Sequence, residues 1–143
     1  MEKICIKAVV ERDIKTTWKA YTDPASIIGW AFASDDWECP YAENDLKVGG
    51  RFLTRMSAKD KSFGFDFVGT YTDVQAGKKI QYVMDKAEKE QVGRACEVAF
   101  DDVGESQTKI VVSFDPEQIN SVEMQKNGWQ SILNNFKKFV EAR

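Results

Sequence analysis

The sequence predicts an α+β fold in which an antiparallel β-sheet wraps around a long C-terminal α-helix, with two short helices after the first strand. Residues 120–143 repeat apolar side chains at the three- and four-residue spacing of a single helical face. Much of the preceding chain alternates apolar and polar residues in short segments that end at turn residues, as strands do. Two short helical patterns follow the first of these segments. Helices gathered on one side of an antiparallel sheet place the chain in the α+β class.

The N-terminal region is expected to form a strand and then the two short helices. Apolar side chains alternate along residues 4–10, which predicts the first strand. Asp13 can cap a helix that continues to about Tyr21. Pro24 suits the first turn of a second helix that continues to about Trp30. The side chains that this second helix should direct inward are Ile27, Ile28 and Trp30.

The middle of the chain is expected to form strands joined by polar turns. Residues 33–40 and 41–45 mix acidic side chains with two aromatic ones, and we interpret them as a short strand followed by an exposed loop. A glycine pair opens a strand over residues 51–57, and residues 59–61 form a hairpin tip. Three later strands are expected over residues 79–84, 94–101 and 107–114.

The strand after the hairpin tip has one face that is almost wholly aromatic. Alternate residues of a strand point to the same side of the sheet. The residues on this face are Phe63, Phe65, Phe67, Gly69 and Tyr71. We expect the face to lie opposite the C-terminal helix.

The C-terminal helix is expected to begin with a capping box, because Asn120 and Glu123 have the spacing of that motif. Its apolar face consists of Trp129, Ile132, Leu133, Phe136, Phe139 and Val140. Gly128 interrupts the pattern. A glycine inside a helix costs about 1 kcal/mol relative to alanine, so we expect either a close contact with the sheet or a cavity at this position.

The composition indicates one globular domain over residues 1–143 that resides in the cytoplasm. Hydrophobic residues make up 43% and charged residues 30% of the chain, values that argue against large-scale disorder. The first residues carry charge and lack the continuous apolar segment of a signal peptide, and no segment predicts membrane insertion. Cys5, Cys39 and Cys96 are far apart and lack metal-site spacing, which favours reduced thiols.

Several functional classes are disfavoured by the composition. The chain has no histidine, which excludes Ser-His-Asp and Cys-His catalysis and imidazole ligation of a metal. A net charge of −3 argues against a nucleic-acid partner, which usually meets a basic surface. No metal and no cofactor are therefore expected. Any catalysis would depend on Asp, Glu, Lys, Tyr, Cys or Arg.

Aromatic side chains are the strongest candidates for a ligand-binding site. Small-molecule sites are usually apolar cavities, but a filled core uses the same residues. From the residues alone both interpretations remain open. The candidate ligand-binding residues are Trp30, Trp37, Phe52, Phe65, Phe67, Tyr71, Tyr82, Gly128, Trp129 and Leu133.

Polar residues form a second, separate group of candidates. The acidic residues 35, 36, 43 and 45 are interpreted as a solvated loop, with Asp36 beside Trp37 as the exception that could act in acid-base chemistry. Arginine can anchor a ligand carboxylate or simply pair with surface acids. The possible polar site residues are Asp36, Arg51 and Arg94, with Arg55 as a further cation.

Motifs along nearly the whole chain resemble one protein family. The matching segments are Thr22-Asp-Pro24 with Ile27 and Trp30, Val48-Gly-Gly50-Arg-Phe52, Gly69-Thr-Tyr71, Ile80-Gln-Tyr82, and Gln125-Lys-Asn-Gly128-Trp129 with Ile132, Leu133 and Phe136. In this order they resemble the START-related SRPBCC superfamily, and within it the domain similar to the C-terminal part of heat-shock protein 90 ATPase activators. Residues 33–40 and 42–46 look like a bacterial subgroup of that family. Eukaryotic activators carry a separate N-terminal chaperone-binding domain, whereas here the first expected strand begins close to Met1.

The resemblance implies the helix-grip fold of START and Bet v-like proteins and favours a cavity between sheet and helix. The superfamily includes lipid carriers, hormone receptors, cyclases and co-chaperone domains, so the fold does not fix one activity. We expect the chain to bind a small, largely apolar molecule without covalent chemistry. One alternative is a cyclase, hydrolase or lyase that uses Asp36 with Tyr71 or Tyr82. Another is a chaperone partner that acts through its outer surface.

Overall fold

A computed structural model describes residues 2–85 and 93–142 of the chain. In chain order the elements are β1 (Ile4–Val10), α1 (Ile14–Thr22), α2 (Pro24–Ile27), β2 (Trp37–Asn44), β3 (Arg51–Ala58), β4 (Gly64–Gln75), β5 (Lys79–Met84), β6 (Ala95–Gly104), β7 (Gln107–Phe114) and α3 (Val122–Glu141). This order confirms the predicted fold class. The predicted final residue of the last helix, Arg143, lies outside the described residues.

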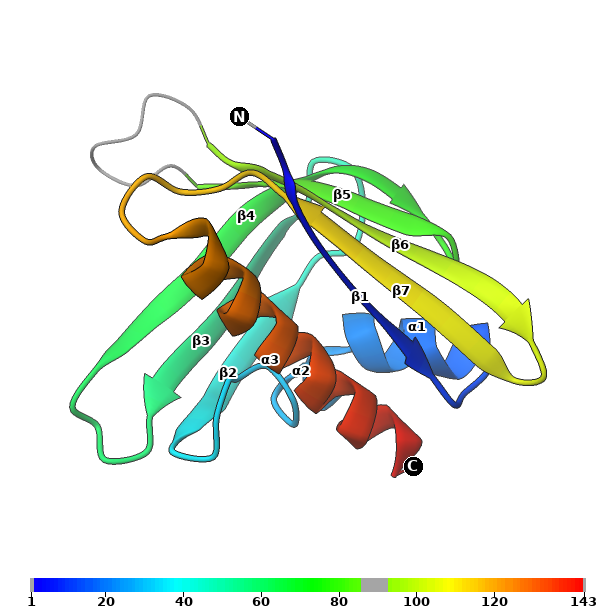
Figure 1. The fold of residues 1–143 in the computed structure, drawn as a ribbon, viewed down its shortest axis with the longest axis horizontal. Helices are drawn as coiled ribbons and strands as arrows, with labels where there is room; N and C mark the ends of the chain where they lie inside the picture. Colours follow the sequence, from blue (N-terminus) through cyan, green and yellow to red (C-terminus); the bar gives the residue numbers. More distant parts are fainter. Residues whose placement is uncertain (1, 86–92, 143) are drawn as a thin grey trace.

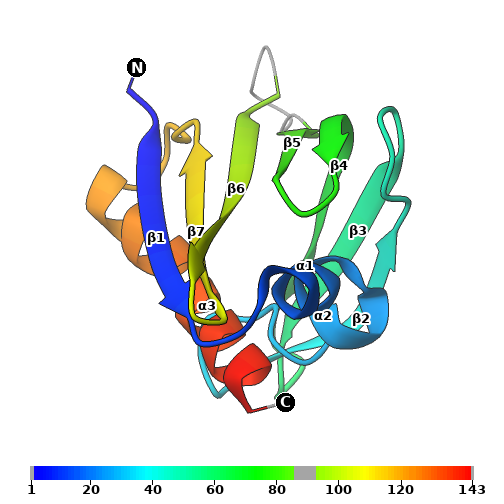
Figure 2. The same cartoon turned by 90° about the vertical axis from the view of Figure 1, so that its right-hand side faces the viewer.

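The seven strands form one antiparallel sheet in the order β1-β7-β6-β5-β4-β3-β2. The first strand lies beside the last, with Ile6 opposite Val112. The sheet curls strongly, and α3 crosses its concave side (Figure 1). Seen from the side, α1 and α2 lie across one end of the curl (Figure 2). Strand twist of a fixed hand accumulates over seven strands and produces such a trough.

The core is densest where α1 and the second half of α3 meet the sheet. Phe136 of α3 and Phe114 of β7 are fully buried. The ring of Tyr21 lies edge-on to Phe136 and Phe100, with centroids 5.1 and 5.4 Å apart. Removal of one such buried ring typically costs 3–5 kcal/mol, so this cluster is a main contributor to stability.

Helices α1 and α3 each begin at a side-chain cap. Asp13 accepts a hydrogen bond from the Thr16 amide, as predicted. The predicted cap at Asn120 is wrong by one residue, because Ser121 accepts from the Met124 amide at 3.1 Å. The third helical residue is then Met124 instead of an acid, so no capping box forms.

The second short helix ends earlier than predicted, at Ile27 instead of Trp30. The Trp30 indole donates to the Ala20 carbonyl at 2.9 Å, and the Asn135 amide donates to the Trp30 carbonyl at 2.9 Å. These bonds hold the chain in a turn and direct Trp30 inward. Ile28, which was predicted to face inward, is 45% exposed.

Strand β2 includes residues that the sequence analysis assigned to a loop. Tyr41 to Asn44 pair with β3, and the register shifts between Glu38 and Tyr41, which leaves Cys39 and Pro40 as a bulge. Proline cannot donate to a ladder, but it is tolerated at a bulge of an edge strand. Because β2 is an edge of the sheet, this position accepts Pro40.

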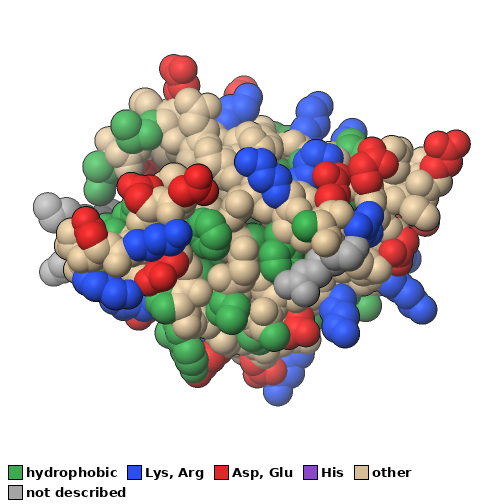
Figure 3. Space-filling view, turned by 90° about the horizontal axis from the view of Figure 1, so that it is seen from below, with side chains coloured by type: hydrophobic (Ala, Val, Ile, Leu, Met, Phe, Trp, Pro, Cys, Tyr) green, Lys and Arg blue, Asp and Glu red, His purple; other side chains and the backbone are tan. Residues whose placement is uncertain are grey.

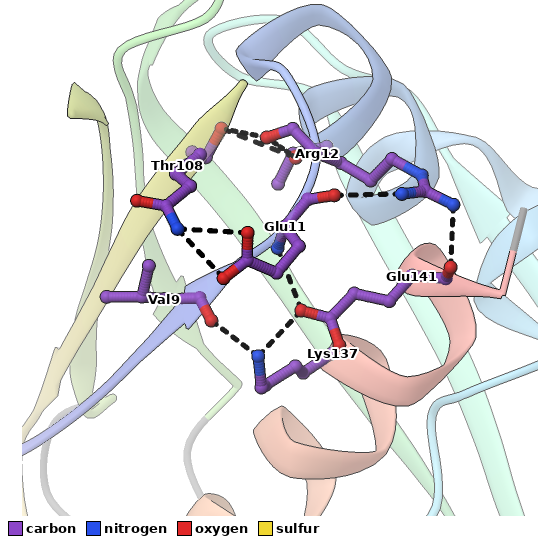
Figure 4. A network of polar contacts seen from close by, with 8 residues as sticks. Val9, Glu11, Arg12, Thr108, Lys137 and Glu141 are labelled. Carbon is purple, nitrogen blue, oxygen red and sulfur yellow. Dashed lines mark hydrogen bonds and ion pairs between the residues drawn. The ribbon is translucent and has the colours of Figure 1, made fainter. Parts of the chain in front are cut away.

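A polar network ties the end of α3 to the end of β1 (Figure 4). Lys137 Nζ donates to the Val9 carbonyl at 2.7 Å and pairs with Glu141 at 2.6 Å. Glu141 also accepts from the Glu11 amide at 2.8 Å, and the Arg12 guanidinium donates to the Glu141 carbonyl at 2.6 Å. We call these contacts the C-terminal clamp. They fix the last turns of α3, whereas in its first half Gln125 is the only buried residue.

Candidate ligand-binding cavity

A cavity of about 310 Å³ lies between the concave face of the sheet and α3. This volume is at the lower end of the range of small-molecule sites, about 300–1,000 Å³. Most of the predicted ligand-binding residues line it, namely Trp30, Phe52, Phe65, Phe67, Tyr71, Tyr82, Trp129 and Leu133. The aromatic side chains thus surround a space and do not simply fill a core.

The periodicity of two elements explains how these side chains converge. Phe65, Phe67 and Tyr71 alternate along β4 and lie on one side of the sheet. The first half of α3 faces them, and the rings of Phe67 and Trp129 approach edge-on with centroids 6.0 Å apart. Trp129 is held in place by stacking on Phe114, with centroids 3.9 Å apart.

Two of the side chains that line the cavity are exposed to solvent, namely Glu43 and Phe65, which is 43% exposed. Trp37 lies outside the cavity walls and instead contacts the rings of Phe63 and Phe65, with centroids 6.0 and 6.1 Å away. Phe63, predicted to lie on the aromatic strand face, precedes β4 and is 62% exposed. Apolar side chains are visible on the lower face of the molecule between acidic and basic ones (Figure 3).

Gly128 is not part of the cavity wall. A Cβ atom placed on it would meet no atom within 4 Å, so the predicted close contact with the sheet is wrong. Nothing in the structure explains why glycine occupies this position.

The three predicted polar site residues do not come together. Asp36 is exposed, accepts a hydrogen bond from Ser34 at 2.6 Å and does not line the cavity. Arg51 forms a two-pronged ion pair with Asp85 at 2.9 and 2.6 Å, also away from the cavity. Only Arg94 lines it. Asp36 therefore cannot share a buried acid-base site with Tyr71 or Tyr82.

Sequence reasoning missed a polar part of the lining. Tyr71 donates its hydroxyl proton to the Asn44 side chain, and the Asn44 amide donates to the Thr22 carbonyl at 2.7 Å. Tyr21 and Thr54 also line the cavity. Alternation along residues 41–44 could have revealed Asn44 if Pro40 had been recognised as a bulge residue.

Burial keeps the three tyrosines of the cavity wall and the nearby Cys96 thiol protonated. It raises the pKa of Tyr21, Tyr71 and Tyr82 well above their ordinary value near 10. Burial also raises the pKa of the Cys96 thiol to about 12, although a hydrogen bond with Tyr82 acts in the opposite direction. A protonated thiol is a poor nucleophile, and the three tyrosines present hydroxyl groups without charge to the cavity.

Over residues 2–85 and 93–142, no three acidic or cysteine side chains are grouped so that they could hold a metal ion. None of the helices in this part of the chain is long and apolar enough to span a membrane.

Comparison with known proteins identifies relatives of this fold. The family model described as activator of Hsp90 ATPase homolog 1-like protein matches residues 12–141. A comparison with curated proteins found no match.

Solved structures from bacteria are similar over almost the whole chain. The AHSA1-like protein from Aeromonas hydrophila is 43% identical, with a TM-score of 0.88 over 98% of this chain and 92% of that one. Chr148 from Cytophaga hutchinsonii is also 43% identical, with a TM-score of 0.80 and the same coverage. CV1439 from Chromobacterium violaceum shares the fold at 19% identity, with a TM-score of 0.83 over 99% of both chains. The chain therefore belongs to the family of activator of Hsp90 ATPase homolog 1-like proteins.

Proposed function

We propose that the protein binds a small, largely apolar molecule without covalent chemistry in the cavity between the sheet and α3. The cavity itself is the observation that carries this proposal, because most of the side chains that surround it are aromatic or aliphatic, with Glu43, Arg94 and Glu117 as its charged members. The three cysteines are all free thiols, which supports a reducing compartment such as the cytoplasm.

The protonation state of the wall supports binding without catalysis. Cys96 and the three cavity tyrosines are neutral at physiological pH, since burial raises the pKa of each. None of them can act as a general base near neutrality, because a general base needs a pKa close to the working pH. An apolar molecule therefore meets a wall that can pack against it and form neutral hydrogen bonds.

A titration with an environment-sensitive hydrophobic dye tests the proposal. We expect dye emission to rise on binding and the melting temperature to increase. A ligand present at 100 times its dissociation constant should add about 2.7 kcal/mol to the free energy of unfolding. If a broad panel of lipids and polycyclic aromatic compounds changes neither dye emission nor melting temperature, the proposal is wrong.

A cavity-filling variant makes this test specific to the site. Ile132 lines the cavity, so the larger side chain of Ile132→Trp should occupy ligand space and weaken dye binding about tenfold or more, which corresponds to about 1.4 kcal/mol. Val122 is exposed at the start of the same helix, and Val122→Trp is the matched control that should bind like the parent. Equal loss of binding in both variants would place the dye elsewhere.

A second candidate function is partnership with a chaperone of the Hsp90 class. It is favoured by three exposed apolar side chains around the start of α3, namely Ile119, Val122 and Met124. Contiguous exposed apolar groups often mark protein contacts. The test is the ATPase rate of a bacterial Hsp90 with added protein. Stimulation that Ile119→Ser and Met124→Ser abolish would support this function, and an unchanged ATPase rate would exclude it.

A further inference from the structure

The hydroxyl groups of the inner cavity wall differ in how they are engaged. Tyr21 from α1, Tyr71 from β4 and Tyr82 from β5 all line the cavity. The Tyr71 hydroxyl donates to Asn44. The Tyr82 hydroxyl lies close enough to the Cys96 thiol for each group to shift the pKa of the other. The Tyr71 proton is thus already used within the protein.

The Tyr21 hydroxyl has no hydrogen-bond partner among the residues that the structure describes. In this same part of the chain, every wholly enclosed side-chain nitrogen or oxygen atom does have a partner. The Tyr21 oxygen is therefore not wholly enclosed. Because its residue lines the cavity, the accessible part of the oxygen faces that space.

Aromatic neighbours fix the direction of the Tyr21 side chain. Its ring packs against Trp30, Phe100 and Phe136, with centroids 4.9, 5.4 and 5.1 Å away. Thr54 also lines the cavity without a hydrogen-bond partner among the described residues, but rotation about one bond redirects its hydroxyl. Tyr21 is thus the pre-oriented donor, and a pre-oriented group loses little entropy when a ligand binds.

The surroundings of Tyr21 favour an uncharged acceptor. Burial is the main cause that raises its pKa, followed by interactions with Cys96 and Tyr71, and no charged lining residue contributes. The hydroxyl therefore stays protonated and can donate. Arg94 lines the cavity elsewhere, but no cation acts on the Tyr21 hydroxyl, so a carboxylate beside it would lose hydration without an adjacent opposite charge. A neutral oxygen loses far less hydration free energy than a carboxylate. It would also accept the hydrogen bond of the Tyr21 hydroxyl, a donor that is costly to leave unpaired in an apolar site.

We propose that Tyr21 Oη recognises the ligand by donating a hydrogen bond to an uncharged oxygen, such as a ketone carbonyl, of an otherwise apolar molecule. This inference rests on the proposed binding function and adds the chemical class of the ligand. It also assigns separate roles to the walls: the rings supply apolar contact, and Tyr21 supplies orientation.

Two probes of similar size, 2-acetylnaphthalene and 2-ethylnaphthalene, test the assignment by calorimetry. Only the first carries a carbonyl. For each protein, parent or variant, we take the ratio of the affinity for the ketone to the affinity for the ethyl compound. Comparing this ratio between proteins cancels the difference in hydration between the two probes. We expect Tyr21→Phe to lower the ketone-to-ethyl ratio about 3- to 10-fold, the range of one neutral hydrogen bond. Tyr71→Phe is the matched control and should leave the ratio unchanged, because the Tyr71 hydroxyl already donates to Asn44.

Infrared spectroscopy of the carbonyl-labelled ketone gives a second, independent measurement. A hydrogen bond should shift the carbonyl band of the bound probe to lower frequency in the parent, and this shift should disappear in Tyr21→Phe. The band of the parent tests the proposal even if Tyr21→Phe does not fold.

The failures of the two proposals are distinguishable. If both probes bind but the ratio is the same in parent and Tyr21→Phe, or only Thr54→Val lowers it, the role of Tyr21 is wrong and the binding function stands. An unshifted carbonyl band in the parent leads to the same conclusion. If neither probe binds the parent, the result counts against the binding function itself, and the assignment of Tyr21 falls with it.

Discussion

Gly128 and Gly69 both lie inside regular elements, but their surroundings differ. A Cβ atom on Gly128 would meet open space, whereas one on Gly69 would lie 2.6 Å from the Val83 carbonyl oxygen and 2.7 Å from the Phe52 ring. The same substitution should therefore have opposite effects at the two positions.

Gly128→Ala should raise the free energy of unfolding by up to about 1 kcal/mol, because alanine favours the helix more than glycine does. Gly69→Ala should lower it by about 1–3 kcal/mol through overpacking. Denaturant unfolding measures both values. Because Gly128 is not part of the cavity wall, Gly128→Ala should also leave dye affinity unchanged. A loss of stability in Gly128→Ala would show that the helix packs more closely there than the structure indicates.

Side-chain periodicity predicted the cavity residues on β4 and α3 because it fixes which face each residue joins. It could not predict that Trp37 lies outside the cavity wall, because the bulge at Cys39 and Pro40 disturbs the alternation of side chains along β2. It also could not predict whether the Tyr21 hydroxyl has a hydrogen-bond partner within the protein. Which hydroxyls find a partner depends on contacts between distant segments, such as Tyr71 with Asn44, and spacing along one segment carries no information on them.

The position of Glu141 in α3 makes the C-terminal clamp sensitive to pH. A carboxylate in the last helical turn is unfavourable for the helix dipole. Partial burial acts to raise the pKa of Glu141, but hydrogen bonds from Lys137 and the Glu11 amide outweigh it and lower the pKa below its ordinary value of 4.5. The folded state therefore binds this proton more weakly than the unfolded state does. The stabilisation is present above pH 4.5 and is lost as the pH falls through the lower folded pKa.

Glu141→Gln should lower the free energy of unfolding by about 1 kcal/mol at pH 7. The difference from the parent should shrink towards zero as the pH falls below 4, because the parent carboxylate is then protonated as well. Urea unfolding at several pH values measures this. Glu105→Gln, in the exposed turn between β6 and β7, is the control and should match the parent. A constant difference at all pH values would mean that Glu141 acts by packing and not by charge.

At the scale of the element, sequence patterns predicted the type and order of the helices and strands well. They predicted the first and last residues of these elements less well. The end of α2 and the start of α3 depend on single hydrogen bonds, from Trp30 to Ala20 and from Met124 to Ser121. Strand β2 was partly hidden because an edge strand tolerates proline and acidic residues that a central strand would exclude.

At the scale of the whole molecule, the sheet and α3 act as two walls that are joined in both halves of the helix. In the first half, Trp129 stacks on Phe114 and Gln130 donates to the Lys7 carbonyl at 3.1 Å. The C-terminal clamp holds the last turns of α3 on β1, while the first half of the helix borders the cavity through Trp129.

The pairing of β1 with β7 also determines when the molecule can fold. Ile4 lies opposite Phe114, so a strand that leaves the ribosome early must wait for more than two-thirds of the chain before it has a neighbour. Until then it is an unpaired edge that can associate with other chains, and α3 is synthesised later still. Because such distant pairings slow folding, we expect stopped-flow refolding in milliseconds to seconds. Refolding within microseconds would show that local contacts dominate, and the nascent chain would then need far less protection than this topology implies.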